Sequence, residues 1–199
     1  MAAFVDVQQK ALCWLACAWA ENFTGAVIDY GSWPDQHREY FTLNDVKVTL
    51  ADAVPGAGLE GQIFGGLEQL VGMLMGRTWL TDDGTPLRIG KLLIDASWGN
   101  STDTVYQFCR QSVHQVSLLP SHGRYISAAA KPFEEWAKKP GDRVGPGWRI
   151  PGSRGQRPVR HGLYDSNFWK TFVHLRLGVA MGDPGCLSLW GREPRRHRM

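Results

Sequence analysis

Two aspartates in this chain stand directly after short apolar runs. Asp6 follows "AFV" and Asp95 follows "LLI", which are patterns typical of buried strands. If the two strands are neighbours in one sheet, the carboxylates converge, and their mutual repulsion at neutral pH requires a cation. Oxygen ligands with no adjacent His or Cys favour Mg²⁺ or Mn²⁺ over zinc. Two such ions can activate a water and stabilise the leaving oxygen of a phosphodiester.

A third acid, Asp165, stands just before an apolar helical stripe that runs through "FWKTFVHLRL". Each of the three acids also has a plain structural interpretation. An Asp at the end of a strand is commonly a turn residue, and Asp165 lies where a helix N-cap is expected. Asp6 differs from the other two because it lies inside its strand, where burial of an unpaired carboxylate is costly.

The elements that would position these acids predict an α/β protein. Residues 2–33 contain three short β-rich runs separated by turns, which predicts an antiparallel meander. Residues 59–76 have helical apolar spacing, and "RIGKLLIDAS" predicts a buried strand that ends at Asp95. A helix over "TDTVYQFCRQ", strands over "HQVSLLPSHG" and "RHGLY", and the helix after Asp165 complete the order. In such sheets, ligands bind at strand ends.

Length, charge and cysteine spacing limit the class of protein. With 199 residues and a formal charge of +3, we expect one globular domain over residues 1–180 and a flexible basic tail over 181–199. Four cysteines without C-x-x-C spacing predict buried thiols in a reducing cytosol. The sequence has no membrane-length apolar run and no signal peptide, so we expect an intracellular protein that is not secreted.

Arginines are concentrated in "RIPGSRGQRPVRH" and in the final segment "GREPRRHRM". Such runs suit a polyanion partner. The alternative is a solvated loop and a basic tail without a binding role.

Three segments, taken in order, resemble a known family. "FVDVQQKALCWLACAW" with "AVIDYGSW", then "LLIDASWGNSTDTVYQFCR", and finally "DSNFWKTFVHLRL" are similar to the C-terminal nuclease domain of the lambda-like large terminase subunits of tailed bacteriophages and prophages. The resemblance implies an RNase H-like fold, in which a mixed sheet of antiparallel meander and parallel strands is flanked by helices. It also implies an endonuclease that cuts concatemeric double-stranded viral DNA in the host cytoplasm with two Mg²⁺ or Mn²⁺ ions.

The resemblance also implies roles for particular residues. Asp6 would bridge both metal ions, Asp95 would be the acid of the fourth strand, and Asp165 would be the third ligand, with Asn167 as the competing position. The residues that the resemblance and the basic stretch suggest for DNA contact are Arg124, Arg154, Arg157, Arg160, His161 and Lys170.

The implied partners are those of DNA packaging: an ATPase motor domain, a small terminase subunit and the portal of the procapsid. The sequence contains no G-x-x-x-x-G-K-[ST] motif, so we expect an excised or split nuclease that does not hydrolyse ATP. Two alternatives stay open, a catalytically silent module that binds DNA or docks on the portal, and another RNase H-like nuclease of the resolvase type.

Overall fold

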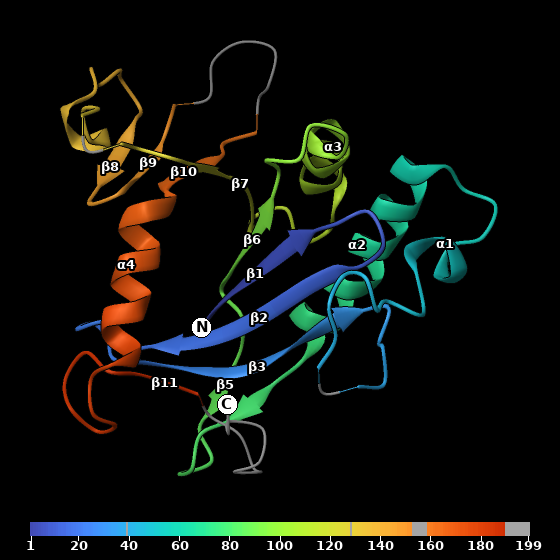
Figure 1. Cartoon of the computed structure of the whole chain (residues 1–199), viewed down its shortest axis with the longest axis horizontal. Coiled ribbons are helices and arrows are strands. Elements are labelled where there is room, and N and C mark those ends of the chain that lie inside the picture. Colours follow the sequence, from blue (N-terminus) through green and yellow to red (C-terminus); the bar gives the residue numbers. More distant parts are fainter. Residues whose placement is uncertain (39, 128, 153–158, 190–199) are drawn as a thin grey trace.

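The fold is seen in a computed structural model that describes residues 1–38, 40–127, 129–152 and 159–189 (Figure 1). Its centre is a mixed sheet, in which the described strands follow the order β11-β3-β2-β1-β6-β7-β10-β9-β8. The strand bounds are β1 Ala2–Val7, β2 Leu12–Trp19, β3 Gly25–Trp33, β6 Lys91–Asp95, β7 Leu118–Arg124, β8 Arg143–Gly145, β9 Trp148–Ile150, β10 Gly162–Asp165 and β11 Leu187–Leu189.

Helices and a small second sheet complete the chain. Their bounds are α1 Leu50–Ala53, α2 Leu59–Gly76, α3 Thr102–Gln111, α4 Ser166–Leu177, the 3₁₀ helix η1 Phe133–Glu135, and the two-stranded sheet of β4 Trp79–Leu80 and β5 Pro86–Leu87. This mixed sheet with flanking helices confirms the α/β prediction and is compatible with the RNase H-like fold.

The two halves of the sheet differ in strand direction. The strands β1, β2 and β3 form the predicted antiparallel meander, whereas β6, β7 and β10 run parallel to β1. The two halves meet where β1 pairs with β6. Parallel neighbours place their carboxyl ends at the same edge of a sheet, so β1, β6, β7 and β10 all end on one side of the molecule.

The core lies between one face of the sheet and helices α2 and α3 (Figure 1). Strand β1 shows the division clearly, because Ala3, Val5 and Val7 are buried in the core while Phe4 and Asp6 point to the opposite face. Helix α2 approaches the sheet closely at Gly66, where a Cβ atom would lie 2.8 Å from the Trp33 ring. Glycine weakens a helix, but at position 66 its lack of a side chain lets α2 pack against the Trp33 ring.

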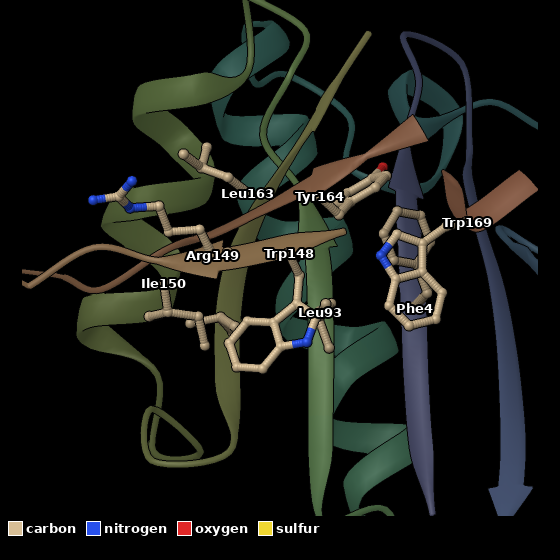
Figure 2. A pocket seen from close by; sticks show the side chains of 10 residues that line it. Phe4, Leu93, Trp148, Arg149, Ile150, Leu163, Tyr164 and Trp169 are labelled. Carbon is tan, nitrogen blue, oxygen red and sulfur yellow. The ribbon is translucent and has the colours of Figure 1, made fainter. Parts of the chain in front are cut away.

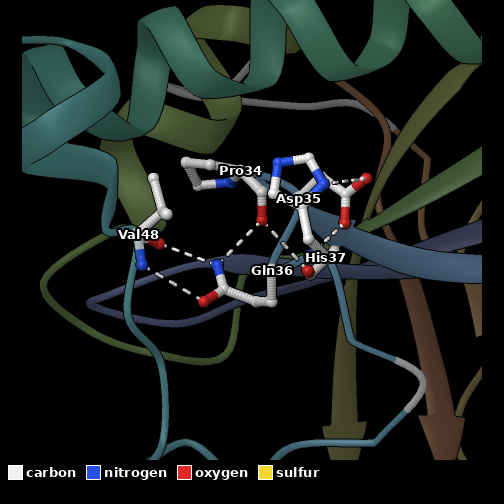
Figure 3. A network of polar contacts seen from close by, with 6 residues as sticks. Pro34, Asp35, Gln36, His37 and Val48 are labelled. Atoms are coloured by element: carbon white, nitrogen blue, oxygen red, sulfur yellow. Dashed lines mark hydrogen bonds and ion pairs between the residues drawn. The ribbon is translucent and has the colours of Figure 1, made fainter.

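A long connection between β3 and α1 is held by the buried side chain of Gln36 (Figure 3). The Gln36 Nε2 group donates hydrogen bonds to the carbonyls of Pro34 at 3.0 Å and Val48 at 2.7 Å. Its Oε1 atom accepts from the amides of Lys47 at 2.8 Å and Val48 at 3.2 Å. One side chain therefore satisfies backbone groups at both ends of the connection.

Residues 143–150 form two strands that the sequence analysis did not predict. Strands β8 and β9 form an antiparallel hairpin at the end of the sheet. The Arg149 guanidinium is buried there and pairs with Asp142, with 2.5 Å between Nη2 and Oδ2. This arginine of the basic stretch therefore stabilises the hairpin and is not exposed for binding.

The described residues include further tests of the sequence predictions. All four cysteines are free thiols, and burial raises the pKa of Cys17 to about 11 and of Cys109 to about 12. Strand β11 pairs in parallel with β3, so the sheet extends past the expected boundary at residue 180. Residues 190–199 of the expected tail lie outside the described residues. Nowhere in the described ranges is a helix long and apolar enough to cross a membrane.

Candidate active site

Asp6 and Asp95 lie side by side on adjacent parallel strands. Val5 of β1 pairs with Ile94 of β6, and the next residue on each strand is the aspartate. Val5 and Ile94 are buried in the core, so both aspartates point to the other face, where each is half-buried. Neighbouring strands are about 4.8 Å apart, which brings the two carboxylates together. The condition set by the sequence analysis, that these two strands are neighbours, is met.

The contacts that Asp6 makes with described residues include no basic group. Its Oδ2 atom accepts a hydrogen bond of 2.9 Å from Gln8 Nε2, a neutral donor. Across the β1–β2 pair stands Cys13, whose thiol pKa is raised by burial and further by the charge of Asp6. No Lys, Arg or His in the described ranges forms an ion pair with Asp6 or Asp95. Two half-buried carboxylates without a basic partner are a site that attracts cations.

Asp95 is linked to the next strand by a short chain of hydrogen bonds. Its Oδ1 atom accepts from the Ser97 amide at 3.1 Å, and Ser97 Oγ accepts from the Gly123 amide at 3.2 Å. Ser121 of β7 is the register partner of Asp95. The carboxyl ends of β6 and β7 therefore form one polar edge that holds the Asp95 backbone and carboxylate in place.

Tyr164 of β10 shares this edge, although the sequence analysis did not identify it. Burial raises the pKa of the Tyr164 hydroxyl, and the nearby charges of Asp95 and Asp6 raise it further. The sequence signal that pointed toward Tyr164 was its place in the strand "RHGLY", directly before the third acid. Which face of the sheet Tyr164 occupies could be established only from the register of β10 on β7.

Asp165 has a different environment from the other two acids. It lies opposite Arg124 at the end of β10, and its Oδ1 atom accepts from the amides of Asn167 at 2.9 Å and Phe168 at 3.3 Å. It is therefore the N-cap of α4. The side chain of Asn167 donates to the Ile126 carbonyl at 3.3 Å. Across the described residues, no three His, Cys, Asp or Glu side chains form a group that could hold a metal ion.

Comparison with known protein families identifies the family of the chain. Residues 1–150 match the family model for the terminase large subunit gpA, endonuclease domain. The chain belongs to this family. The comparisons with curated proteins and with solved structures found no match. The matched region contains Asp6 and Asp95 on their paired strands and ends before Asp165. Membership of the terminase endonuclease family supports a nuclease role in phage DNA packaging, as the sequence resemblance implied.

The basic residues expected to contact DNA in this terminase domain come from different elements, with Arg124 at the end of β7 and Lys170 in α4. Arg124, Arg160 and Lys170 are exposed. His161 is half-buried and packs against the rings of Tyr106 and His122, with centroids 6.0 Å and 5.5 Å away. Two further predicted contacts, Arg154 and Arg157, lie outside the described residues. Of the described set, Arg124 is the nearest in register to an acid of the site, opposite Asp165.

An apolar pocket of about 480 Å³ adjoins the acid pair of the terminase domain (Figure 2). Its floor includes Phe4 and Leu93, which lie two residues before Asp6 and Asp95 on the same strands. Trp148 of β9 and Trp169 of α4 line its sides. The acids therefore lie between this aromatic pocket and the polar ends of the strands.

Proposed function

We propose that this domain hydrolyses phosphodiester bonds of concatemeric double-stranded DNA in a two-metal reaction that uses Mg²⁺ or Mn²⁺. The observation that carries the proposal is the pair formed by Asp6 and Asp95, which lie on adjacent parallel strands and have no basic partner among the described residues. Family membership supplies the nuclease role. The acid pair supplies the reason for a metal requirement, since a DNA phosphate brought to two carboxylates is repelled unless cations offset their charge.

The residues present fit hard divalent cations. The donors are carboxylate oxygens, with no thiolate or imidazole in the acid pair. Asp6 and Asp95 would together hold such ions. When bound, such ions supply a water of lowered pKa and offset negative charge on the leaving oxygen.

The third ligand is proposed to be Asp165, with Asn167 as the alternative. The capping bonds of Asp165 both use Oδ1, so Oδ2 takes part in neither. Asn167 offers an amide oxygen, since its Nδ2 group already donates to Ile126. A carboxylate is the stronger ligand for a hard cation, which favours Asp165.

The chain's own residues would orient the reacting groups. Gln8 and Ser97 hold the two carboxylates by hydrogen bonds, which limits their rotation. Exposed Arg124, Arg160 and Lys170 would neutralise phosphates along the duplex. In packaging, the ATPase motor, the small terminase subunit and the portal would bring the DNA to this face.

The proposal is tested with supercoiled plasmid incubated in EDTA, Mg²⁺ or Mn²⁺. The wild-type domain is compared with Asp6→Asn, which keeps the side-chain shape but removes the charge. Asp82→Asn is the matched control, because Asp82 is an exposed carboxylate in the turn between β4 and β5 and the same change is made there. Metal-dependent nicking that Asp6→Asn loses and Asp82→Asn keeps is the expected result. Equal activity of Asp6→Asn and wild type would overturn the proposal.

A second candidate function is a catalytically silent module that binds DNA or docks on the portal. It is favoured by the capping role of Asp165, together with the lack of a three-residue metal group in the described part of the chain. This candidate predicts a wild type that is inert in every metal while still binding duplex DNA. Binding by phosphate contacts alone should weaken steeply as salt rises.

A further inference from the structure

The Tyr164 hydroxyl lies near enough to Asp6 and Asp95 to feel their charge, and no described residue forms a hydrogen bond with it. Tyr164 pairs with Gly123 of β7 and lies on the same face of the sheet as Asp6 and Asp95. Figure 2 shows its hydroxyl pointing away from Trp148 and Leu93 of the apolar pocket. The side chain is half-buried, and its hydroxyl forms no hydrogen bond with any residue the structure describes. A hydroxyl in such a position is available to a ligand.

Gly123 leaves the space that the Tyr164 hydroxyl occupies. A Cβ atom at this position would lie 3.1 Å from the Tyr164 oxygen and 3.0 Å from Ser166 Oγ. The φ angle of Gly123 is not positive, so the backbone does not require glycine here. Glycine is therefore needed here for its lack of a side chain. It leaves room for the hydroxyls of Tyr164 and Ser166 beside the polar edge that Ser97 links to Asp95.

The chemistry of the Tyr164 side chain determines what it can do at this site. A tyrosine hydroxyl carries one hydrogen that it can donate to an acceptor oxygen. A group that donates beside an acid pair is complementary to an oxygen-rich, negatively charged substrate. The DNA phosphate that the acids would act on provides such oxygens.

We propose that Tyr164 is a substrate-contacting residue of the nuclease, whose hydroxyl donates a hydrogen bond to the DNA phosphate at the acid pair, and that Gly123 keeps its place open. The inference rests on the proposed function and adds a neutral donor to the acids and cations. A donor aimed at a phosphate oxygen contributes most where negative charge increases during the reaction. Its loss should therefore affect the rate of cleavage more than the binding of DNA.

The test compares Tyr164→Phe and Gly123→Ala with wild type. Single-turnover cleavage of plasmid is measured in Mg²⁺, and the Kd for a short duplex is measured in Ca²⁺. We expect each variant to cut at least tenfold more slowly, with a Kd within about twofold of wild type and an unchanged Tm. Tyr30→Phe is the matched control, because it removes the same hydroxyl five strands away in the sheet, roughly 24 Å at 4.8 Å per strand.

A double variant tests whether the two residues act together. Because both changes act on one hydroxyl, Tyr164→Phe with Gly123→Ala should be no slower than the worse single variant. Tyr164→Phe that cuts as fast as wild type, while Asp6→Asn is inert, would overturn this inference and leave the nuclease standing. A lower Tm with proportionate loss of DNA affinity would overturn it in favour of a structural role. A wild type that fails to cut in any metal would overturn both proposals.

Discussion

Asp165 has two proposed roles that substitution can separate. As the N-cap of α4, its Oδ1 atom accepts hydrogen bonds from two backbone amides. As the third metal ligand, it would contribute negative charge. Asp165→Ala removes both the acceptor and the charge, whereas Asp165→Asn keeps an oxygen acceptor of nearly equal capping strength and removes only the charge.

The expected effect on stability follows from the capping bonds. Loss of an Asp N-cap costs about 1 kcal/mol, within a range of roughly 0.5–2 kcal/mol. In a chain of 199 residues, this lowers Tm by about 2–4 °C per kcal/mol. Asp165→Ala should therefore melt a few degrees below wild type, and Asp165→Asn should melt within about 1 °C of it.

Thermal unfolding and plasmid cleavage in Mg²⁺ are measured on the same preparations. We expect Asp165→Ala to lose both stability and cleavage, and Asp165→Asn to lose at least tenfold in cleavage alone, since a carboxamide is a weaker ligand than a carboxylate. Asn167→Ala serves as the competing variant. Asp165→Asn with wild-type cleavage would refute the assignment of Asp165 as a ligand, and Asp165→Ala with an unchanged Tm would refute its capping role.

Three further predictions concern other parts of the molecule. Mn²⁺ at ten times its Kd should stabilise the wild type by about 1.4 kcal/mol, or roughly 3–6 °C in Tm, and a thermal scan of Asp6→Asn should show a much smaller shift. Gln36→Leu leaves buried backbone groups without partners, so urea unfolding should show a loss of about 1–3 kcal/mol with cleavage unchanged. The amides of Gly152 and Lys139 and the Arg149 guanidinium hold the pKa of Asp142 well below its usual 3.8. The stabilisation that ionised Asp142 gives the folded state is therefore present above about pH 4 and is lost as pH falls further. The Tm of wild type should exceed that of Asp142→Asn by an amount that shrinks between about pH 4 and about pH 2. A difference in Tm that stays constant over this range would contradict the prediction.

Local patterns in the sequence predicted the elements that carry the first two acids. Apolar runs ending in Asp6 and Asp95 predicted strands, and helical spacing predicted α2 and α3, because each pattern reflects burial on one face of a single element. That the two strands are neighbours was a conditional expectation. It depended on the sheet order, which no local pattern encodes.

The remaining features depend on contacts between distant segments. The Gly- and Arg-rich region lacks periodicity, so the hairpin that buries Arg149 against Asp142 left no pattern to read. Tyr164 joins the acids only through the register of β10 on β7. The last strand, β11, is three residues long, and the tail composition masked it. Asp165 illustrates the limit most clearly, since both a cap and a ligand precede a helix in sequence.

The position of the acid pair at the junction of the two sheet halves also sets when the site can exist during folding. The meander that carries Asp6 forms from local contacts, whereas its pairing with β6 joins segments far apart in the chain and carries a larger loop-closure entropy. Non-local parallel pairing is the slower class of folding event. A newly made chain would therefore hold Asp6 in a strand before Asp95 arrives beside it, and the capacity to cut DNA would appear only with the late steps of folding.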